Sequence, residues 1–167
     1  MKKLKLLKQG IDLIVYDFDG VMTDNKAFFF EDAREAVLVN RSDGLAVSII
    51  KKSGIPQIII STEPNKVVQA RARKLKIPCL YNISDKKAAL IMYCRKMQFD
   101  IKKTIYIGND INDFEAMKIA GIPMAPLDAS VEIRRMARVI INVRGGDGVI
   151  RGLLNLLNLE RAKEDDK

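Results

Sequence analysis

The feature that most constrains the fold is a repeated alternation between short apolar segments and longer amphipathic ones. The apolar segments are rich in β-branched residues and are continuous rather than alternating. Such runs are expected of strands that are covered on both faces of a parallel sheet. The sequence predicts six of these strands, at residues 11–16, 55–60, 77–81, 104–108, 122–125 and 138–143.

The segments between the strands predict helices. Several begin with Asp, Asn or Ser and two end in Gly, which are common capping residues. The expected helices span residues 44–54, 65–76, 85–98, 113–121, 130–137 and about 148–162. Alternation of strands and helices favours an α/β fold, a doubly wound, Rossmann-like parallel sheet with right-handed crossovers.

Residues 25–42 depart from this alternation. Three phenylalanines, a polar stretch and the apolar run AVLV predict a β-hairpin that is inserted after the first strand. The chain of 167 residues has the length of one ordinary domain, so we expect a single domain over residues 1–167. Residues 163–167 are expected to be frayed.

Polar residues of a restricted kind follow the predicted strands. In open parallel sheets, ligands bind beyond the carboxyl ends of the strands, so these residues are expected to share one edge. They are Asp17 and Asp19 after the first strand, Ser61 and Thr62 after the second, Lys86 at the start of the helix that follows the third, and Asn109, Asp110 and Asp113 after the fourth.

These residue types indicate phosphoryl transfer. Two carboxylates in alternate positions at the end of a buried strand are tolerable only if something positive is bound there. Mg²⁺ prefers oxygen ligands, and a hydroxyl with a lysine suits the charge of a phosphoryl group in transfer. One aspartate can attack phosphorus, while a second can protonate the leaving alkoxide and then activate water.

The composition excludes several other classes. The chain contains no histidine, which rules out Ser-His-Asp and Cys-His catalysis and zinc sites built on imidazole. Cys79 and Cys94 lie in apolar surroundings and are expected to be free thiols of a cytoplasmic protein. No apolar stretch approaches the roughly 20 residues that span a bilayer, and MKKLKLLKQG lacks the apolar region of a signal peptide.

The net charge of +8 is compatible with nucleic acid, acidic lipids or small anions. Aromatic residues make up 6% of the chain and are not interleaved with the basic residues as stacking platforms would be. We therefore expect solvated basic helix faces and a small anionic substrate, without a nucleic-acid or membrane partner.

The ordered motifs resemble those of the haloacid dehalogenase-like (HAD) phosphohydrolases. Their four motifs correspond to DFDG (17–20), Ser61, Lys86 and GNDIND (108–113). The resemblance extends over most of the chain, through TDN (23–25), RSDG (41–44), STEPNKVVQARARKLKI (61–77) and RGGDGVIR (144–151). It points to the branch without a cap domain that acts on 3-deoxy-octulosonate 8-phosphate and on 9-phosphorylated nonulosonates, which are sialic-acid-type sugars.

The resemblance implies specific roles for the motif residues. Asp17 is expected to be the nucleophile and a metal ligand. Asp19 is expected to be the general acid and base, with its main-chain carbonyl on the metal. Ser61 and Lys86 are expected to bind the phosphoryl group, and Asp113 to hold Lys86.

The cofactor implied by the resemblance is Mg²⁺. The family pattern often has Asp directly after the glycine of the fourth motif, as a third metal ligand. Here that residue is Asn109, and Asp110 follows it. An amide oxygen is a neutral ligand, so either Asn109 or Asp110 is expected to complete the metal site.

The second motif bears on the substrate. The octulosonate enzymes tend to carry Thr-Gly-Arg there, whereas this chain has Ser61-Thr62-Glu63. Glu63 resembles the nonulosonate pattern, in which the acid meets polar sugar groups and pairs with a helix lysine, here Lys74. The alternative is that Glu63 only caps the following helix. We favour a 9-phosphorylated nonulosonate, with 3-deoxy-octulosonate 8-phosphate next, and expect further substrate contacts from Thr62, Asp43, Arg144, Gly145 and Gly146.

Members of this branch form tetramers in which hairpins and a neighbour's C-terminal segment close the site. The resemblance therefore implies a homotetramer with the hairpin at 25–40 and the RGGDG stretch (144–148) at subunit contacts. The alternatives are that the phenylalanines pack in the core and that RGGDG is only a tight turn before the last helix.

Two other classes remain open. One is a non-catalytic binding or tetramerisation domain, like the related domain fused to some acylneuraminate cytidylyltransferases, and the neutral Asn109 motivates it. The other is a phospho-accepting receiver, which also uses acids, a hydroxyl and a lysine. Its phosphorylated aspartate, however, follows a central strand and does not lie in D-x-D-G after the first strand.

Overall fold

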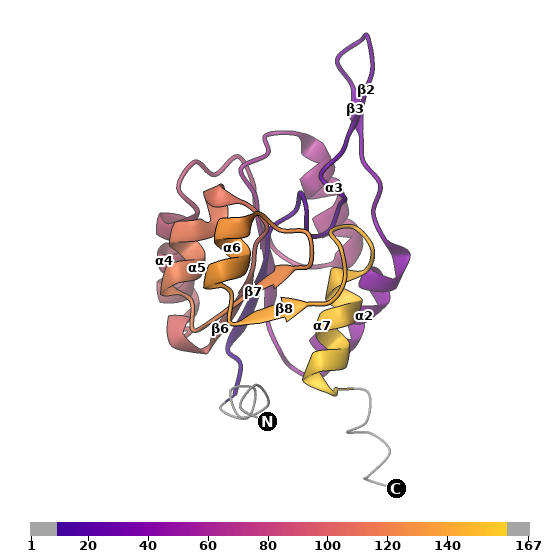
Figure 1. Ribbon diagram of the computed structural model, residues 1–167. Coiled ribbons are helices and arrows are strands. Elements are labelled where there is room, and N and C mark those ends of the chain that lie inside the picture. The colour runs from indigo at the N-terminus through magenta and orange to yellow at the C-terminus, as the bar shows by residue number, and fades with distance from the viewer. Residues whose placement is uncertain (1–9, 160–167) are drawn as a thin grey trace, which may run out of the picture.

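The computed structural model describes residues 10–159, and a six-stranded parallel sheet forms its centre (Figure 1). The strand order is β5-β4-β1-β6-β7-β8. The strands are β1 (Leu13–Tyr16), β4 (Gln57–Ile60), β5 (Cys79–Leu80), β6 (Thr104–Ile107), β7 (Ile122–Pro126) and β8 (Val139–Ile141). All six predicted strands are present, which confirms the α/β fold. The predicted frayed tail lies outside the described residues.

Six helices cover the two faces of this sheet within residues 10–159. Figure 1 shows α4, α5 and α6 on one side of the sheet and α2 and α7 on the other, and α3 packs into the same core as α2 and α7. The helices are α2 (Arg41–Lys52), α3 (Lys66–Leu75), α4 (Lys86–Met97), α5 (Phe114–Ile119), α6 (Val131–Met136) and α7 (Val149–Leu157), with 3₁₀ turns η1 (Ile101–Lys103) and η2 (Ile111–Asp113).

The central strands are buried on both faces, which explains their continuous apolar sequence. In β1, Ile14 and Tyr16 pack against the layer of α2, α3 and α7. Leu13 and Val15 pack against the layer of α4, α5 and α6. All four side chains are fully buried. The three aliphatic side chains, of Leu13, Ile14 and Val15, each contribute about 1.5–3 kcal/mol when buried, so packing against both layers stabilises the sheet.

The chain order places a ligand-binding crevice at one edge of the sheet. From β1, in the middle, the chain first builds β4 and β5 on one side and then β6, β7 and β8 on the other. In open α/β sheets, the crevice lies where this direction reverses, beyond the carboxyl ends of the strands. Here that point lies between the ends of β1 and β6, which pair in parallel along their length.

The predicted hairpin is present but shorter than expected. Strands β2 (Phe28–Phe29) and β3 (Glu35–Ala36) pair antiparallel and project from the body of the molecule (Figure 1). Phe28, Phe29 and Phe30 are 62%, 72% and 46% exposed, so they do not pack in the core of this chain.

Two predicted helix ends were wrong. Helix α2 begins at Arg41 rather than at residue 44, because the Asn40 side chain accepts a hydrogen bond from the Ser42 N–H and caps the helix. Helix α7 ends at Leu157, because Asn158 adopts a left-handed conformation with φ of 54°. Within residues 10–159, no helix has both the length and the apolar character needed to cross a membrane.

Candidate active site

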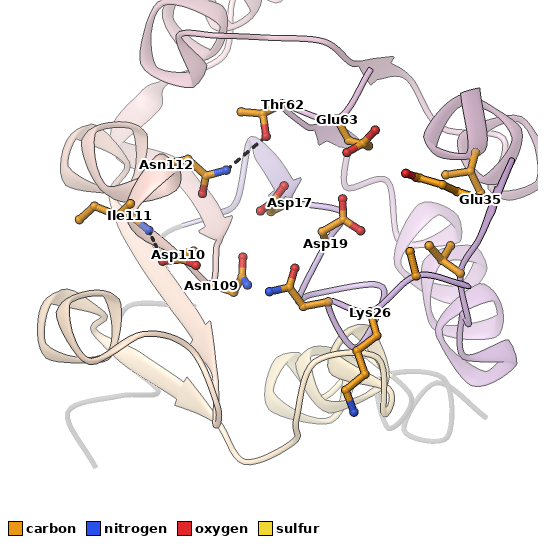
Figure 2. Close-up of a pocket in the computed structure, with 14 residues that line it drawn as sticks. Asp17, Asp19, Lys26, Glu35, Thr62, Glu63, Asn109, Asp110, Ile111 and Asn112 are labelled. Carbon is orange, nitrogen blue, oxygen red and sulfur yellow. Dashed lines mark hydrogen bonds between the residues drawn. The ribbon is translucent and has the colours of Figure 1, made fainter. Parts of the chain in front are cut away.

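A pocket of about 420 Å³ lies at the carboxyl ends of β1, β4 and β6 (Figure 2). The loop after β1, the hairpin, the loop after β4 and the loop after β6 each contribute to its lining. The residues involved are Asp17, Asp19, Asn25, Lys26, Ala27, Glu35, Val37, Thr62, Glu63, Val67 and Asn109, Asp110, Ile111 and Asn112. The structure therefore brings the acids of the first and fourth motifs to one pocket.

Asp17 is the first residue after β1, and its position is fixed by the sheet. Its N–H donates to the Ile107 carbonyl at 2.9 Å, which continues the pairing with β6 by one residue. Its Oδ1 accepts a hydrogen bond from the Phe18 N–H at 2.7 Å and forms an ion pair with Lys86 Nζ at 2.8 Å. Only 5% of the side chain is exposed, and that exposed part lines the pocket.

Lys86 is the first residue of α4 and lies directly behind Asp17. Its Nζ is 2.8 Å from Asp17 Oδ1 and 2.7 Å from Asp113 Oδ1. The lysine and Asp113 side chains are 1% and 0% exposed. One buried cation thus bridges two carboxylates, and the cluster carries one excess negative charge when all three groups are ionised.

The electrostatics of this cluster favour a bound cation. Burial raises the pKa of Asp17 well above its usual value and Asp113 adds to the rise, while Lys86 opposes it. Burial alone lowers the pKa of Lys86, but the two carboxylates outweigh this and raise it. Lys86 therefore stays charged, and a further positive charge at the pocket would keep Asp17 ionised.

Asp113 is held from several sides. Its Oδ2 accepts the Asn109 N–H at 2.9 Å, and its Oδ1 accepts the Tyr106 hydroxyl at 3.1 Å. A Cβ at Gly108 would lie 2.5 Å from the Asp113 Cβ, so the glycine of the fourth motif makes room for this carboxylate. Tyr106 was not among the predicted site residues. The available signal was a hydroxyl-bearing residue in a buried strand, two positions before the fourth motif.

Asp19 lines the pocket beside Asp17 and is half-buried (Figure 2). The pKa of Asp19 is raised overall, chiefly by burial and further by the nearby charges of Glu63 and Glu35. A hydrogen bond from the Thr23 hydroxyl at 3.1 Å opposes this rise. A carboxyl with a raised pKa can donate a proton near neutral pH, which suits a general acid.

Asn109 and Asp110 differ in what their side chains do. Figure 2 shows the amide oxygen of Asn109 pointing toward Asp17 and Asp19. Its amide nitrogen lies against Gly20, whose φ is +74° and where any Cβ would overlap that nitrogen. Asp110 Oδ1 instead accepts the Ile111 N–H at 2.7 Å and caps η2 (Figure 2).

The donors around the pocket suit a hard cation. Residues 10–159 contain no group of three or more His, Cys, Asp and Glu side chains arranged to hold a metal ion. Two carboxylates with an amide oxygen and main-chain carbonyls are, however, an all-oxygen set, and Mg²⁺ typically takes one or two carboxylates and completes its shell with waters and phosphate. The residues present therefore fit Mg²⁺.

The second motif is partly buried. Ser61 is 1% exposed, and its hydroxyl oxygen accepts the Glu63 N–H at 3.1 Å. It does not line the pocket, whereas Thr62 does, and the Thr62 hydroxyl accepts a hydrogen bond from Asn112 Nδ2 at 3.3 Å (Figure 2). The phosphoryl-binding role of Ser61 remains a prediction.

Glu63 lines the pocket beside Glu35 (Figure 2), and its Oε1 also accepts the Asn65 N–H at 2.9 Å. The N-cap of α3 is Asn65 and not Glu63, so Glu63 makes a local contact just before the helix and also lines the pocket. The predicted pairing with Lys74 within the chain was wrong. Lys74 lies in the last turn of α3, eight residues after the first helical residue Lys66 and therefore about 12 Å farther along the helix axis. It lines a separate groove with Arg41 and Arg71.

Comparisons with known proteins agree with this geometry. Residues 2–153 match the haloacid dehalogenase-like hydrolase family. The chain belongs to this family. A 3-deoxy-D-manno-octulosonate 8-phosphate phosphatase from Yersinia pestis is 30% identical over 155 residues, which cover 92% of this chain and 83% of the relative. The predicted family and the predicted enzyme class, a phosphoric monoester hydrolase, are therefore confirmed.

Two solved structures illustrate how far the similarity of this HAD hydrolase extends. The 3-deoxy-D-manno-octulosonate 8-phosphate phosphatase of Moraxella catarrhalis, in complex with magnesium, phosphate and the sugar acid, is 25% identical with a TM-score of 0.91. The two chains are covered to 99% and 98%. A Streptomyces avermitilis protein assigned to the HAD hydrolases is 42% identical with a TM-score of 0.86, and 89% and 91% of the chains are covered.

Four further residues predicted to bind substrate do not line the pocket of this HAD hydrolase: Asp43, Arg144, Gly145 and Gly146. Asp43 is 1% exposed, and its Oδ1 accepts the Arg151 N–H at 2.9 Å at the start of α7. The N-cap residue of α7 is Gly148, which has no side chain to cap the helix. Asp43 supplies that cap from α2.

Gly145 and Gly146 lie behind the loop that follows β1. The Gly146 N–H donates to the Val21 carbonyl at 3.2 Å, and a Cβ at Gly146 would lie 2.6 Å from the Asp24 nitrogen. A Cβ at Gly145 would collide with the Gly20 carbonyl. The two glycines therefore allow a close approach that supports the loop carrying Asp19 from behind.

Proposed function

We propose that this chain is a Mg²⁺-dependent phosphatase that removes the terminal phosphate of a 3-deoxy sugar acid through an aspartyl-phosphate intermediate. The observation that carries the proposal is the buried cluster of Asp17, Lys86 and Asp113 behind a pocket that Asp19 also lines. This is a nucleophile beside a fixed cation, with a second carboxyl at hand for proton transfer.

The metal ligands in this proposal are the Asp17 carboxylate, the Asp19 carbonyl and the Asn109 amide oxygen. The orientation of the Asn109 oxygen toward Asp17 supports it, and the capping hydrogen bond of Asp110 argues against Asp110 as a direct ligand. When bound, Mg²⁺ supplies positive charge that polarises the phosphoryl oxygens and keeps the site oriented.

The protein residues then perform two half-reactions. The Asp17 carboxylate attacks phosphorus, the bond to the sugar oxygen breaks, and Asp19 donates its proton to that oxygen. Asp19, now ionised, takes a proton from a water that attacks the aspartyl-phosphate and releases inorganic phosphate. Lys86, 2.8 Å from Asp17, stabilises the negative charge during both steps.

The favoured substrate is a 9-phosphorylated nonulosonate. Glu35 and Glu63 form an acidic wall of the pocket, and such a wall suits the hydroxyl and amide donors of a large sugar. Both candidate sugar acids carry a carboxylate, which the two acids would repel, so that carboxylate is expected to lie away from Glu35 and Glu63. The second candidate is 3-deoxy-D-manno-octulosonate 8-phosphate, which is supported by the names of the Yersinia and Moraxella relatives.

We further propose a homotetramer in the cytoplasm, without a nucleic-acid partner. The three exposed phenylalanines of the hairpin support the assembly, because exposed apolar side chains on a projecting hairpin are favourably covered by another chain. The hairpin also contributes Lys26 and Glu35 to the pocket, so its contacts in the assembly would bear on the site.

The test is phosphate release from 9-phosphorylated N-acetylneuraminate and from 3-deoxy-D-manno-octulosonate 8-phosphate, assayed side by side with Mg²⁺. We expect turnover of both and a higher kcat/KM for the first. Asp17→Asn should lower kcat by more than about 10³-fold. Asp12→Asn is the matched control, because Asp12 precedes β1 at its opposite end, and should retain activity.

The outcomes separate the alternatives. Release from neither sugar by the folded protein would favour a non-catalytic binding domain. Undiminished turnover by Asp17→Asn would contradict the aspartyl-phosphate mechanism. A long-lived phosphate on Asp17 would favour a receiver.

A further inference from the structure

Tyr106 connects the apolar interior to the buried charges. It lies on β6, opposite Val15 of the neighbouring strand β1. Its side chain is fully buried, at 0% solvent exposure, and packs in the apolar layer beneath α4 and α5. Its hydroxyl is nevertheless 3.1 Å from Asp113 Oδ1, at the start of α5. The ring spans the distance between the strand and the charged cluster.

The hydroxyl meets the same carboxylate oxygen that receives Lys86. Asp113 Oδ1 accepts Lys86 Nζ at 2.7 Å and Tyr106 at 3.1 Å, while Oδ2 accepts the Asn109 N–H at 2.9 Å. Tyr106 stays protonated, because burial and then Asp113 raise its pKa well above the usual value. It is therefore a permanent neutral donor, held by packing rather than by a flexible chain.

This arrangement affects how Lys86 divides its contacts. Lysine has a flexible four-carbon stem, and its ammonium is here shared between Asp113 and Asp17 at 2.7 and 2.8 Å. Without the hydroxyl, Asp113 Oδ1 would depend on Lys86 for its hydrogen bond, and a buried carboxylate draws strongly on a remaining cation. The ammonium would then move toward Asp113 and away from Asp17.

We propose that Tyr106 is a positioning residue that keeps Lys86 shared between Asp17 and Asp113. The inference rests on the proposed function where it concerns turnover, since Lys86 then stabilises charge on the group that Asp17 attacks. As a statement about where the ammonium lies, it does not depend on catalysis.

The chain offers a matched control in Tyr16. This tyrosine lies on β1, is also 0% exposed, and its hydroxyl donates one hydrogen bond, to Gln57 Oε1 at 2.8 Å. It faces the opposite layer of the core, with α2, α3 and α7. Tyr16→Phe and Tyr106→Phe thus remove the same buried group, but only the second removes a donor to Asp113.

The kinetic arm compares both variants with the unmodified chain, with both sugar-acid phosphates as substrates. Tyr106→Phe should lower kcat about tenfold and leave KM within about twofold, since loss of one hydrogen bond to a charged group has this size. Tyr16→Phe should leave kcat within about twofold, although both variants lose some thermal stability. Equal kcat values for the two variants would overturn the proposal.

The second arm does not need turnover. The full chain is labelled with ¹⁵N-lysine, and the ammonium signal of Lys86 is assigned by its loss in Lys86→Met and followed by NMR without metal. The signal should be protected and unchanged in Tyr16→Phe, but shifted and faster-exchanging in Tyr106→Phe. An unchanged signal in Tyr106→Phe would overturn the proposal. If the unmodified chain cleaves neither sugar phosphate, the proposed function fails, and this arm still decides the role of Tyr106.

Discussion

Lys86 Nζ lies 2.8 Å from Asp17 Oδ1, and only 1% and 5% of the two side chains are exposed. Such a buried contact between opposite charges is costly to form and still more costly to break. Removing one partner leaves the other charge without compensation in a low-dielectric interior. The contact therefore links the stability of the fold to the charge of Asp17, the proposed nucleophile.

Lys86→Met tests that link. The substitution leaves Asp17 and Asp113 buried without a cation, so the free energy of unfolding should fall by about 3–5 kcal/mol. Phosphatase activity should be lost in the same variant, as measured under conditions where it is still folded. Urea unfolding followed by circular dichroism measures the change in stability.

The control is the neighbouring residue. Lys87 forms an exposed pair with Glu115 at 3.3 Å, and 42% and 56% of those side chains are exposed. Lys87→Met should change stability by less than about 1 kcal/mol, because exposed pairs contribute little. Similar losses in both variants would show that the burial of Lys86 has no special effect.

Asn109→Asp tests the proposed metal ligand. Replacing a neutral amide oxygen with a carboxylate should lower the Mg²⁺ concentration for half-maximal activity by about tenfold, a change of about 1.4 kcal/mol. Asn112→Asp is the control, because Asn112 lines the same pocket but its amide donates to Thr62. Mg²⁺ titration of activity and calorimetry with the metal alone measure both variants. An equal gain in both would indicate a general effect of pocket charge.

Asp43→Asn tests the buried helix cap. Burial raises the pKa of Asp43 from 3.8 to about 6, and its Oδ2 has no hydrogen-bond partner. Between pH 4 and pH 6, the folded state holds a proton that the unfolded state has lost, so the contribution of Asp43 to stability falls as the pH rises. The loss amounts to about 2–3 kcal/mol by pH 7.

Asparagine retains the acceptor for the start of α7 without this titration. The melting temperature of Asp43→Asn should therefore rise relative to that of the unmodified chain as the pH increases from 4 to 7. Thermal unfolding at pH 4.5, 5.5 and 7 measures the difference. Curves that stay parallel over this range would contradict the assignment.

Phe29→Asp tests the proposed assembly. Phe29 is 72% exposed on strand β2 of the hairpin, and a charge there should weaken an apolar subunit contact. The variant should elute as a smaller species in size-exclusion chromatography with light scattering. Met92→Asp on α4 is the control, because Met92 is 70% exposed and lies away from the hairpin. A mass that is the same for both variants and the unmodified chain would exclude the hairpin from the assembly.

The sequence predicted the elements that follow from local pattern. Continuous apolar runs mark strands that are covered on both faces, and the residues after these strands mark the pocket edge, which is why Asp17 and Asn109 were expected together. The residues that such patterns cannot reveal are those that act across layers. Tyr106 donates to Asp113 from the buried strand β6. Asp43 caps α7 although it lies 108 positions before Arg151 in the chain.

The errors have a similar origin. The expected pairing of Glu63 with Lys74 followed a family pattern and ignored the length of α3, which separates the two side chains. The start of α2 was placed too late because the preceding AVLV run was extended as a strand, although Asn40 was a local capping signal. Local capping chemistry decided where the helix began.

The close packing of Gly145 and Gly146 against residues 20–24 has a consequence for synthesis of the chain. Asp17 leaves the ribosome about 128 residues before Gly145, so its loop is made well before the segment that packs behind it. Domains generally fold as units once enough of the chain is available. A nascent chain would therefore carry the proposed nucleophile without this support until residue 146 has emerged, and a chain shortened before residue 144 would keep Asp17 but lose the packing behind its loop.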